Sequence, residues 1–175
     1  MKDVNVRDLI GQPGASRRLR VSEPVPGLAM ELAVVPEDSP VKGDVLLESV
    51  VEGILVSGSL SGEMTLTCAR CLTTFEGSFD LSVHELFTAD ATEEDDEYPV
   101  SDGFVNLEAL IRDAVLPAMP FAPLCRSDCL GICERCGRDR NVGQCVCTPD
   151  VDSRWAPLAA LRLPEPSTSQ QSARR

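Results

Sequence analysis

The sequence predicts an α+β protein: an antiparallel sheet, able to curl toward a barrel, followed by one helix and a small cysteine-rich C-terminal module. Three observations support this fold class. Residues 75–87 alternate between apolar and polar side chains, as a strand with one buried face does. Residues 107–115 place apolar side chains at the i, i+3, i+4 spacing of an amphipathic helix. Residues 125–147 contain six of the eight cysteines.

Strands are expected between residues 28 and 87. The apolar segment 28–35 ends at Pro36, and residues 44–71 are typical of two strands. The Gly- and Ser-rich "SGSLSG" at 57–62 suits a hairpin or a bulged turn between those two strands. These strands predict an antiparallel sheet with one face buried. The apolar face of the last strand consists of Phe75, Phe79, Leu81, Val83 and Phe87.

An acidic, turn-rich loop is expected at about 88–103. It contains five consecutive acidic residues, Glu93 to Glu97, which we interpret as a solvated loop. A helix is predicted at about 106–117, because Asn106 is a suitable N-cap for the apolar stripe that follows it. Three prolines then end the helix and stiffen the segment that leads into the cysteine-rich region, which we call the lead segment: Pro117, Pro120 and Pro123.

These elements divide the chain into a β-rich domain at residues 1–124 and a cysteine-rich module at 125–163. The final segment, 164–175, has no apolar residue that could anchor it to a core, so we expect it to be disordered. The sequence shows no signal peptide and no apolar run of roughly 20 residues, which predicts a cytoplasmic protein without a membrane partner. Ordinary thiols stay reduced in that compartment.

The net charge of −12 is concentrated in the first half of the chain. Residues 1–100 contain 19 acidic and 7 basic side chains, whereas residues 101–175 contain 9 of each. Because an acidic surface repels phosphate, we expect any contact with nucleic acid to lie in the second half.

The cysteine spacing indicates metal binding. A C-x-x-C turn directs two sulfurs at one point, and four thiolates are well suited to a structural, tetrahedral Zn²⁺. Gly137 and Gly143 allow tight turns beside the C-terminal thiols. We therefore predict a four-ligand zinc site of ribbon or knuckle type, formed by Cys133, Cys136, Cys145 and Cys147.

The remaining thiols form a second predicted set. Cys68 and Cys71 end a strand, and Cys125 and Cys129 follow the proline-rich lead. A zinc ion held by these four thiols would clamp the sheet to the C-terminal module, although Cys125 or Cys129 could instead exchange with the other set. The sequence thus predicts two zinc ions.

Other uses of the thiols fit the sequence less well. A disulfide framework conflicts with a cytoplasmic compartment, and a thioredoxin-like C-x-x-C needs a βαβ context that "TLTCARCLTTF" lacks. A cysteine nucleophile needs a histidine base, but the only histidine, His84, lies on the polar face of its strand. An iron–sulfur cluster also uses four thiolates, and spacing alone leaves it open beside zinc. All-cysteine sites are usually closed and no catalytic motif is present, so we predict no enzyme activity and no small-molecule substrate.

Arginines accompany the thiols. Arg70 and Arg135 each precede the second cysteine of a C-x-x-C pair, where a guanidinium can screen the negative charge of four thiolates. Arg126, Arg138 and Arg140 also lie in the module, and there we expect contacts with RNA phosphate.

The segments "LTCARCL", "NLEALIRDAVLPAMPFAPLC", "CLGICERCGRDRN" and "DSRWAPL" together resemble the YceD family, the large ribosomal RNA subunit accumulation proteins. The resemblance extends from about Val4 to Leu163, with Ser153 where the family commonly has proline. It implies a role in the accumulation or processing of 23S rRNA, and so in assembly of the large ribosomal subunit. It supplies no catalytic residues.

Together these observations predict a non-enzymatic ribosome-assembly factor that uses a zinc-stabilised module to bind rRNA or a large-subunit ribosomal protein. Two alternatives stay open: a zinc-dependent protein-binding scaffold without direct RNA contact, and a thiol redox switch.

Overall fold

The computed structural model describes residues 3–89, 91, 98–143, 145–147 and 153–161. Its eight strands form one sheet in the order β1-β8-β7-β6-β5-β4-β2, with β3 paired to β5 off this path. The pairs are antiparallel except β6 with β7, which is parallel. The strands are β1 (Val4–Asn5), β2 (Ser16–Glu23), β3 (Ala33–Val34), β4 (Val41–Ser49), β5 (Ile54–Thr67), β6 (Thr74–Thr88), β7 (Tyr98–Ser101) and β8 (Phe104–Val105).

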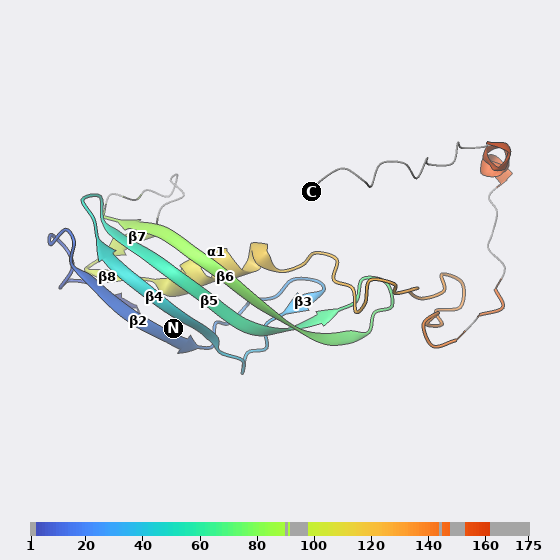
Figure 1. The fold of residues 1–175 in the computed structure, drawn as a ribbon, viewed down its shortest axis with the longest axis horizontal. Coiled ribbons are helices and arrows are strands. Elements are labelled where there is room, and N and C mark those ends of the chain that lie inside the picture. The colour runs from blue at the N-terminus through green and yellow to red at the C-terminus, as the bar shows by residue number, and fades with distance from the viewer. Residues whose placement is uncertain (1–2, 90, 92–97, 144, 148–152, 162–175) are drawn as a thin grey trace, which may run out of the picture.

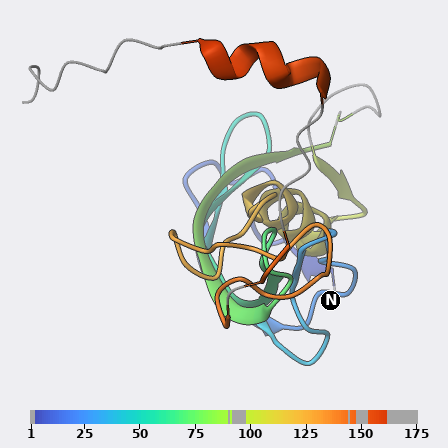
Figure 2. The same ribbon diagram turned by 90° about the vertical axis from the view of Figure 1, so that its right-hand side faces the viewer.

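The two longest strands, β5 and β6, span 14 and 15 residues and form the centre of the sheet. Their side chains alternate between a buried and a solvated face over most of their length, because successive residues of a strand point to opposite sides. The sheet curls around its buried face, as the view along the molecule shows (Figures 1 and 2). The predicted antiparallel sheet is therefore present as a curled half-barrel with one parallel pair.

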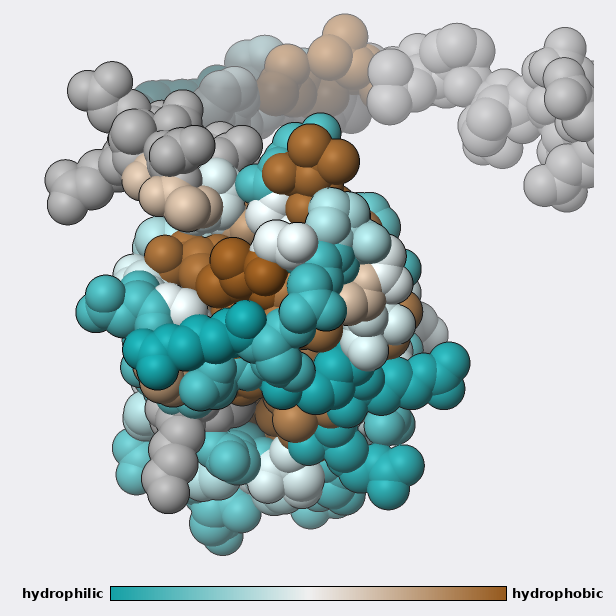
Figure 3. Space-filling model, turned by 90° about the vertical axis from the view of Figure 1, so that its left-hand side faces the viewer, coloured by the Kyte–Doolittle hydropathy of each residue, from teal (hydrophilic) through white to brown (hydrophobic). Residues whose placement is uncertain are grey.

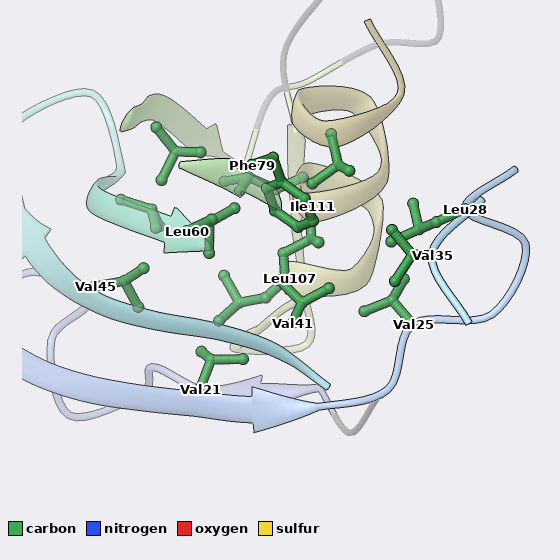
Figure 4. Close-up of a cluster of buried hydrophobic side chains, with 14 of the residues drawn as sticks. Val21, Val25, Leu28, Val35, Val41, Val45, Leu60, Phe79, Leu107 and Ile111 are labelled. Carbon is green, nitrogen blue, oxygen red and sulfur yellow. The ribbon is translucent and has the colours of Figure 1, made fainter. Parts of the chain in front are cut away.

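Helix α1, Leu107–Ala118, lies inside the curl of the sheet (Figure 2). Asn106 caps it, since its Oδ1 accepts the backbone N–H groups of Glu108 at 2.9 Å and Ala109 at 3.3 Å. Leu107 and Ile111 point from α1 toward the sheet (Figure 4). The helix and its N-cap confirm the prediction from the apolar spacing.

The core fills the space between α1 and the concave face of the sheet. Val41, Val45 and Leu60 come from the strands, and Val25 and Val35 come from the segment between β2 and β4 (Figure 4).

Arg17 of β2 contacts the first residues of the chain across the open side of the curl. Its guanidinium donates to the carbonyl of Asn5 in β1, and its Nη1 lies 3.1 Å from Asp8 Oδ2. The curl thus brings the two ends of the strand order within reach of one side chain.

The expected turn at "SGSLSG" is wrong, because residues 57–62 lie inside β5. The hairpin turn comes earlier, where the backbone N–H of Val50 donates to Gly53 O at 2.9 Å. Glycine is present at Gly62 because a neighbouring side chain comes close: a Cβ there would lie 2.7 Å from two ring atoms of Phe79 on β6. Composition alone does not distinguish a turn glycine from a glycine covered by an aromatic ring.

Two other expectations are corrected. The segment 28–35 forms only the short strand β3, because it folds back on itself with Met30 N–H donating to Ala33 O at 2.7 Å and Val35 N–H donating to Leu28 O at 2.9 Å. The expected loop at 88–103 contains β7 and the start of a hairpin with β8. The acidic run 93–97 and the tail 164–175 lie outside the described residues.

A 3-10 helix, η1 (Ser153–Ala160), follows the cysteine-rich region, and its Trp155 is 64% exposed. The cysteine-rich region itself lies at one end of the sheet, beside the β5–β6 turn (Figure 1). The opposite end carries the β4–β5 turn with the exposed Val51, and apolar side chains gather on this face (Figure 3). No helix among the described residues has the length and apolar character needed to cross a membrane.

Candidate metal centres

The eight cysteines lie in two groups of four, and within each group the sulfur atoms all lie within 4.8 Å of one another. Site 1 consists of Cys68, Cys71, Cys125 and Cys129. Site 2 consists of Cys133, Cys136, Cys145 and Cys147. These are the two sets that the sequence spacing predicts.

The turn between β5 and β6 presents the first pair of site 1. The backbone N–H of Cys68 donates to Thr73 O at 2.9 Å, and the N–H of Leu72 donates back to Cys68 O at 2.9 Å. Leu72 takes a positive φ of 60°, which closes the turn tightly and brings the sulfurs of Cys68 and Cys71 to one side.

The chain that leaves α1 brings the second pair to this turn. Pro123 O accepts the backbone N–H of Ala69 at 2.8 Å, which fixes the lead segment against the turn. Cys125 Sγ then lies 3.6 Å from Cys71 Sγ, and Cys129 Sγ lies 3.8 Å from Cys68 Sγ. Site 1 therefore joins the hairpin tip to residues more than 50 positions later.

Site 2 repeats the same turn. The backbone N–H of Cys133 donates to Arg138 O at 2.8 Å, and the N–H of Gly137 donates to Cys133 O at 2.8 Å. Gly137 has a φ of 68°, close to that of Leu72. Cys145 and Cys147 complete the set of four from the far side of the loop.

The distances in site 1 fit a tetrahedral metal ion. A Zn–S bond of about 2.3 Å gives a tetrahedron whose sulfur–sulfur edge is about 3.8 Å. The measured separations of 3.6 Å and 3.8 Å match this edge. They are far longer than the S–S bond of a disulfide, at about 2.05 Å, and all eight cysteines are free. Both groups can thus hold a metal ion with four sulfur ligands.

Backbone N–H groups prepare one thiolate in each site. Hydrogen bonds from the N–H groups of Cys125, then Cys71 and Arg70, lower the pKa of Cys68 from 9.0 to about 6 against the opposing effect of burial. The N–H groups of Cys136 and Arg135 lower the pKa of Cys133 to about 6 in the same way. The two C-x-x-C turns therefore favour the ionised form that a metal requires.

Another thiol in each site resists ionisation. Desolvation of its sulfur, and then hydrogen bonds to neighbouring thiols led by Cys71, raise the pKa of Cys125 to about 12, although the residue as a whole is exposed. A hydrogen bond to Cys136, followed by burial, raises the pKa of Cys147 to about 12. Four thiolates this close repel one another, so a bound cation is what would allow all four to ionise.

The two sites differ in exposure. Cys68 and Cys129 are 0% and 2% exposed, and they form a small apolar cluster with Phe75, Leu124 and Ile132 that is separate from the main core. In site 2 only Cys133 is buried, and Cys136 is exposed. Three of the four thiols of site 1 are thus buried and only Cys125 is exposed, whereas site 2 lies nearer the surface.

The arginines that the sequence singles out take different places. Arg70 Nη1 donates to Cys129 O at 3.0 Å, so it supports a ligand residue through the backbone carbonyl. Arg126 donates to Asn141 Oδ1 at 2.6 Å and lies 3.4 Å from Asp128 Oδ1. Three more are exposed: Arg135, Arg138 and Arg140.

Two polar residues near the sulfurs were missed by the sequence analysis. Thr73 Oγ1 lies 3.3 Å from Cys71 Sγ, and its hydroxyl lowers the pKa of that thiol. Asn141 Nδ2 donates to Cys129 Sγ at 3.4 Å. Thr73 could have been found from the sequence, because it carries a hydroxyl only two positions after Cys71. Asn141 could not, because it lies 12 residues from Cys129.

Comparison with known proteins gives one family. The sequence profile described as "Large ribosomal RNA subunit accumulation protein YceD" matches residues 56–162. The uncharacterized protein ML1660 of Mycobacterium leprae is 37% identical over 169 residues, which cover 91% of this chain and 77% of the relative. The uncharacterized protein Rv2926c of Mycobacterium tuberculosis is 34% identical over 172 residues, covering 94% of this chain and 83% of the relative.

A more distant relative is the uncharacterized protein YlbN of Bacillus subtilis, 32% identical over 73 residues that cover 40% of this chain and 42% of YlbN. No solved structure matches the chain. The residues that the family profile matches include both C-x-x-C turns, α1 and all eight thiols. The chain belongs to the YceD family, the large ribosomal RNA subunit accumulation proteins.

Proposed function

We propose that this protein is a non-enzymatic assembly factor of the large ribosomal subunit, which supports the processing or accumulation of 23S rRNA in the cytoplasm. The proposal depends on one observation: this chain, a member of the YceD family, has eight thiols in two four-sulfur sites at one end of its sheet. Such sites build a rigid binding surface and leave no coordination position for a substrate.

Zinc is the ion that suits these sites best. It accepts four thiolates in tetrahedral geometry and performs no redox chemistry, and the sulfur separations of 3.6 Å and 3.8 Å in site 1 agree with its bond length. Site 1 and site 2 would each hold one ion. When bound, the ion supplies folding energy to a module that has few buried apolar side chains of its own.

We assign the RNA contact to Arg138 and Arg140. Both are exposed, and their side chains form no hydrogen bond or ion pair with another residue in the described part of the chain. Arg140 also lines a hollow of about 450 Å³ beside site 2, together with Leu130 and Gly143. Arg126 is engaged with Asn141 and Asp128, so its role is to hold the module together.

Salt-dependent RNA binding tests this assignment. The affinity of the zinc-loaded protein for 23S rRNA fragments should fall steeply with salt, and the Arg138→Ala, Arg140→Ala double variant should reduce the slope by about 0.7 per lost phosphate contact. Arg18→Ala with Arg20→Ala removes the same charge from β2 and serves as the matched control. A slope unchanged by the module variant would reject the assignment.

Depletion of the protein in cells tests the function itself. Precursor 23S rRNA should accumulate and the pool of large subunits should fall. Normal rRNA and subunit profiles after depletion would reject the proposed function.

A second candidate, a scaffold that binds a basic ribosomal protein, is favoured by the edge of β6. Among the described residues, positions 74–86 of β6 pair only with β5, which leaves one side of the strand open to an added strand. Residues 71–111 contain eleven acidic residues and no lysine or arginine, so a basic extended segment would suit this edge. Capture of a basic large-subunit protein without RNA binding would favour the scaffold, and Glu76→Lys with Asp80→Lys should then abolish the capture.

A further inference from the structure

Asn141 belongs to the loop of site 2 but contacts site 1. It lies between Cys136 and Cys145, whose thiols close that loop. Its Nδ2 donates to Cys129 Sγ at 3.4 Å, and its Oδ1 accepts the backbone N–H of Leu130 at 2.8 Å. One side chain of site 2 therefore contacts a sulfur of site 1 and the backbone that follows it.

The carboxamide of Asn141 uses its full hydrogen-bonding capacity. Its Oδ1 also accepts from Arg126 Nη2 at 2.6 Å, and its Nδ2 also donates to Asp139 Oδ1 at 2.7 Å. An amide has two acceptor and two donor positions, and all four are filled here. A carboxylate would lose both donors and would place a negative charge beside a thiolate and Asp139.

The backbone joins the same two sites. Asp139 Oδ1 accepts the N–H of Asn141 at 2.8 Å and so fixes the loop around it. Asp139 also forms a β-bridge with Ile132, and the N–H of Ile132 donates to Arg70 O at 3.0 Å in the β5–β6 turn. The loop of site 2, residues 131–132 and the turn of site 1 thus form one continuous hydrogen-bonded path.

We propose that Asn141 is a positioning residue that couples the two metal sites, so that filling site 2 raises the affinity of site 1 for its ion. Filling site 2 fixes the loop that carries Asn141, and the fixed amide then holds Cys129 in place for site 1. The coupling is reciprocal, because linked binding equilibria affect each other by the same factor. The inference rests on the metal binding in the proposed function.

The experiment uses the full chain loaded with Cd²⁺ as the probe, since ¹¹³Cd NMR gives one resonance for each site. Titration with a chelator then measures the affinity of each site separately. Asn141→Ala should lower the affinity of site 1 by about 10- to 100-fold, the usual effect of removing a partner that orients a metal ligand. The matched control is Val142→Ala, because Val142 is the next residue in the loop and is 86% exposed. It should leave both affinities unchanged.

A double-mutant cycle tests the coupling itself. Cys145→Ser opens site 2 and should lower the affinity of site 1 by about the same factor as Asn141→Ala, and the two changes together should do no more. Circular dichroism of the sheet shows that each variant remains folded.

Two results would overturn the inference alone. One is an Asn141→Ala protein whose site 1 keeps its affinity within twofold. The other is a Cys145→Ser change that weakens site 1 equally with and without Asn141. A wild-type chain that binds no metal in either site would overturn the proposed function as well, which keeps the two failures distinct.

Discussion

Leu72 and Gly137 occupy equivalent positions in two copies of one turn, with φ angles of 60° and 68°. Each donates its backbone N–H to the carbonyl of the first cysteine of its pair, at 2.9 Å and 2.8 Å. A left-handed conformation costs a residue with a Cβ about 1–2 kcal/mol, and glycine avoids this cost. The hairpin tip of site 1 therefore contains a strained leucine where site 2 has a relaxed glycine.

The turn of site 2 should depend on that glycine. Gly137→Ala should weaken metal binding at site 2 by about 5- to 30-fold, the equivalent of 1–2 kcal/mol. Apart from its two chain neighbours, no atom of the described residues lies within 4 Å of the added Cβ, so the change acts through the backbone. Chelator competition measures the affinity. Leu72→Gly is the reverse change at site 1 and should not weaken it; equal losses in both variants would contradict the equivalence of the turns.

Removal of one ligand should have different effects in the two sites. Cys145→Ser should unfold the loop of site 2 and leave the sheet intact, because a structural zinc ion contributes on the order of 10 kcal/mol to a small domain. Cys68→Ser should instead release the junction between the hairpin tip and the lead segment at Pro123. Limited proteolysis with mass mapping checks both, and unchanged cleavage in the two variants would show that the sites do not hold the structure together.

Tyr98 should ionise only at strongly alkaline pH. Burial, and then the hydrogen bond from its hydroxyl to Asp113 Oδ2 at 3.1 Å, raise the pKa of Tyr98 above its ordinary value near 10. A raised pKa in the folded state contributes stability that is fully present below pH 10 and is lost as the pH rises through the folded value. Tyr98 is the single tyrosine, so tyrosinate absorbance reports it directly.

The matched variant for Tyr98 is Asp113→Asn, which removes the negative charge and should lower the pKa of the phenol toward 10. Protein unfolded in urea gives the reference value. A wild-type titration that coincides with the unfolded one would show that the contact does not persist in solution.

The centre of the sheet should not accept a side chain at Gly62. Gly62→Ala places a Cβ 2.7 Å from the ring of Phe79 and should cost about 1–3 kcal/mol of stability, because the ring has to move in a packed core. Ser59→Ala, at an exposed position of the same strand, should change the stability by less than about 0.5 kcal/mol. Urea unfolding measures both, and a Gly62→Ala protein as stable as wild type would show that Phe79 is not held over the glycine.

The pairing of the thiols could be predicted from the sequence, because C-x-x-C turns and the proline-rich lead limit which sulfurs can meet. The strand of residues 75–87 and the helix after Asn106 could also be predicted, since each repeats its apolar side chains at the period of its own backbone. These features depend on short segments of the chain.

Features set by contacts between distant segments could not be predicted. Gly62 resembles a turn residue until Phe79 is placed over it, and β7 is a strand because it pairs with the end of β6. Asn141 has no recognisable motif, and its importance depends on the folded position of Cys129. Local patterns specify elements and ligand pairs, whereas partners between distant segments require the three-dimensional arrangement.

Cys71 and Cys125 are 54 residues apart, so the ligands of site 1 emerge from the ribosome at different times. During synthesis the hairpin tip emerges with two thiols long before the other two exist, so an early ion finds an incomplete site. Site 1 can close only after β7, β8 and α1 have left the ribosome. Its closure therefore requires that every strand of the sheet and α1 have been made, and a nascent protein that stalls before Cys125 would expose two unligated thiols at the hairpin tip.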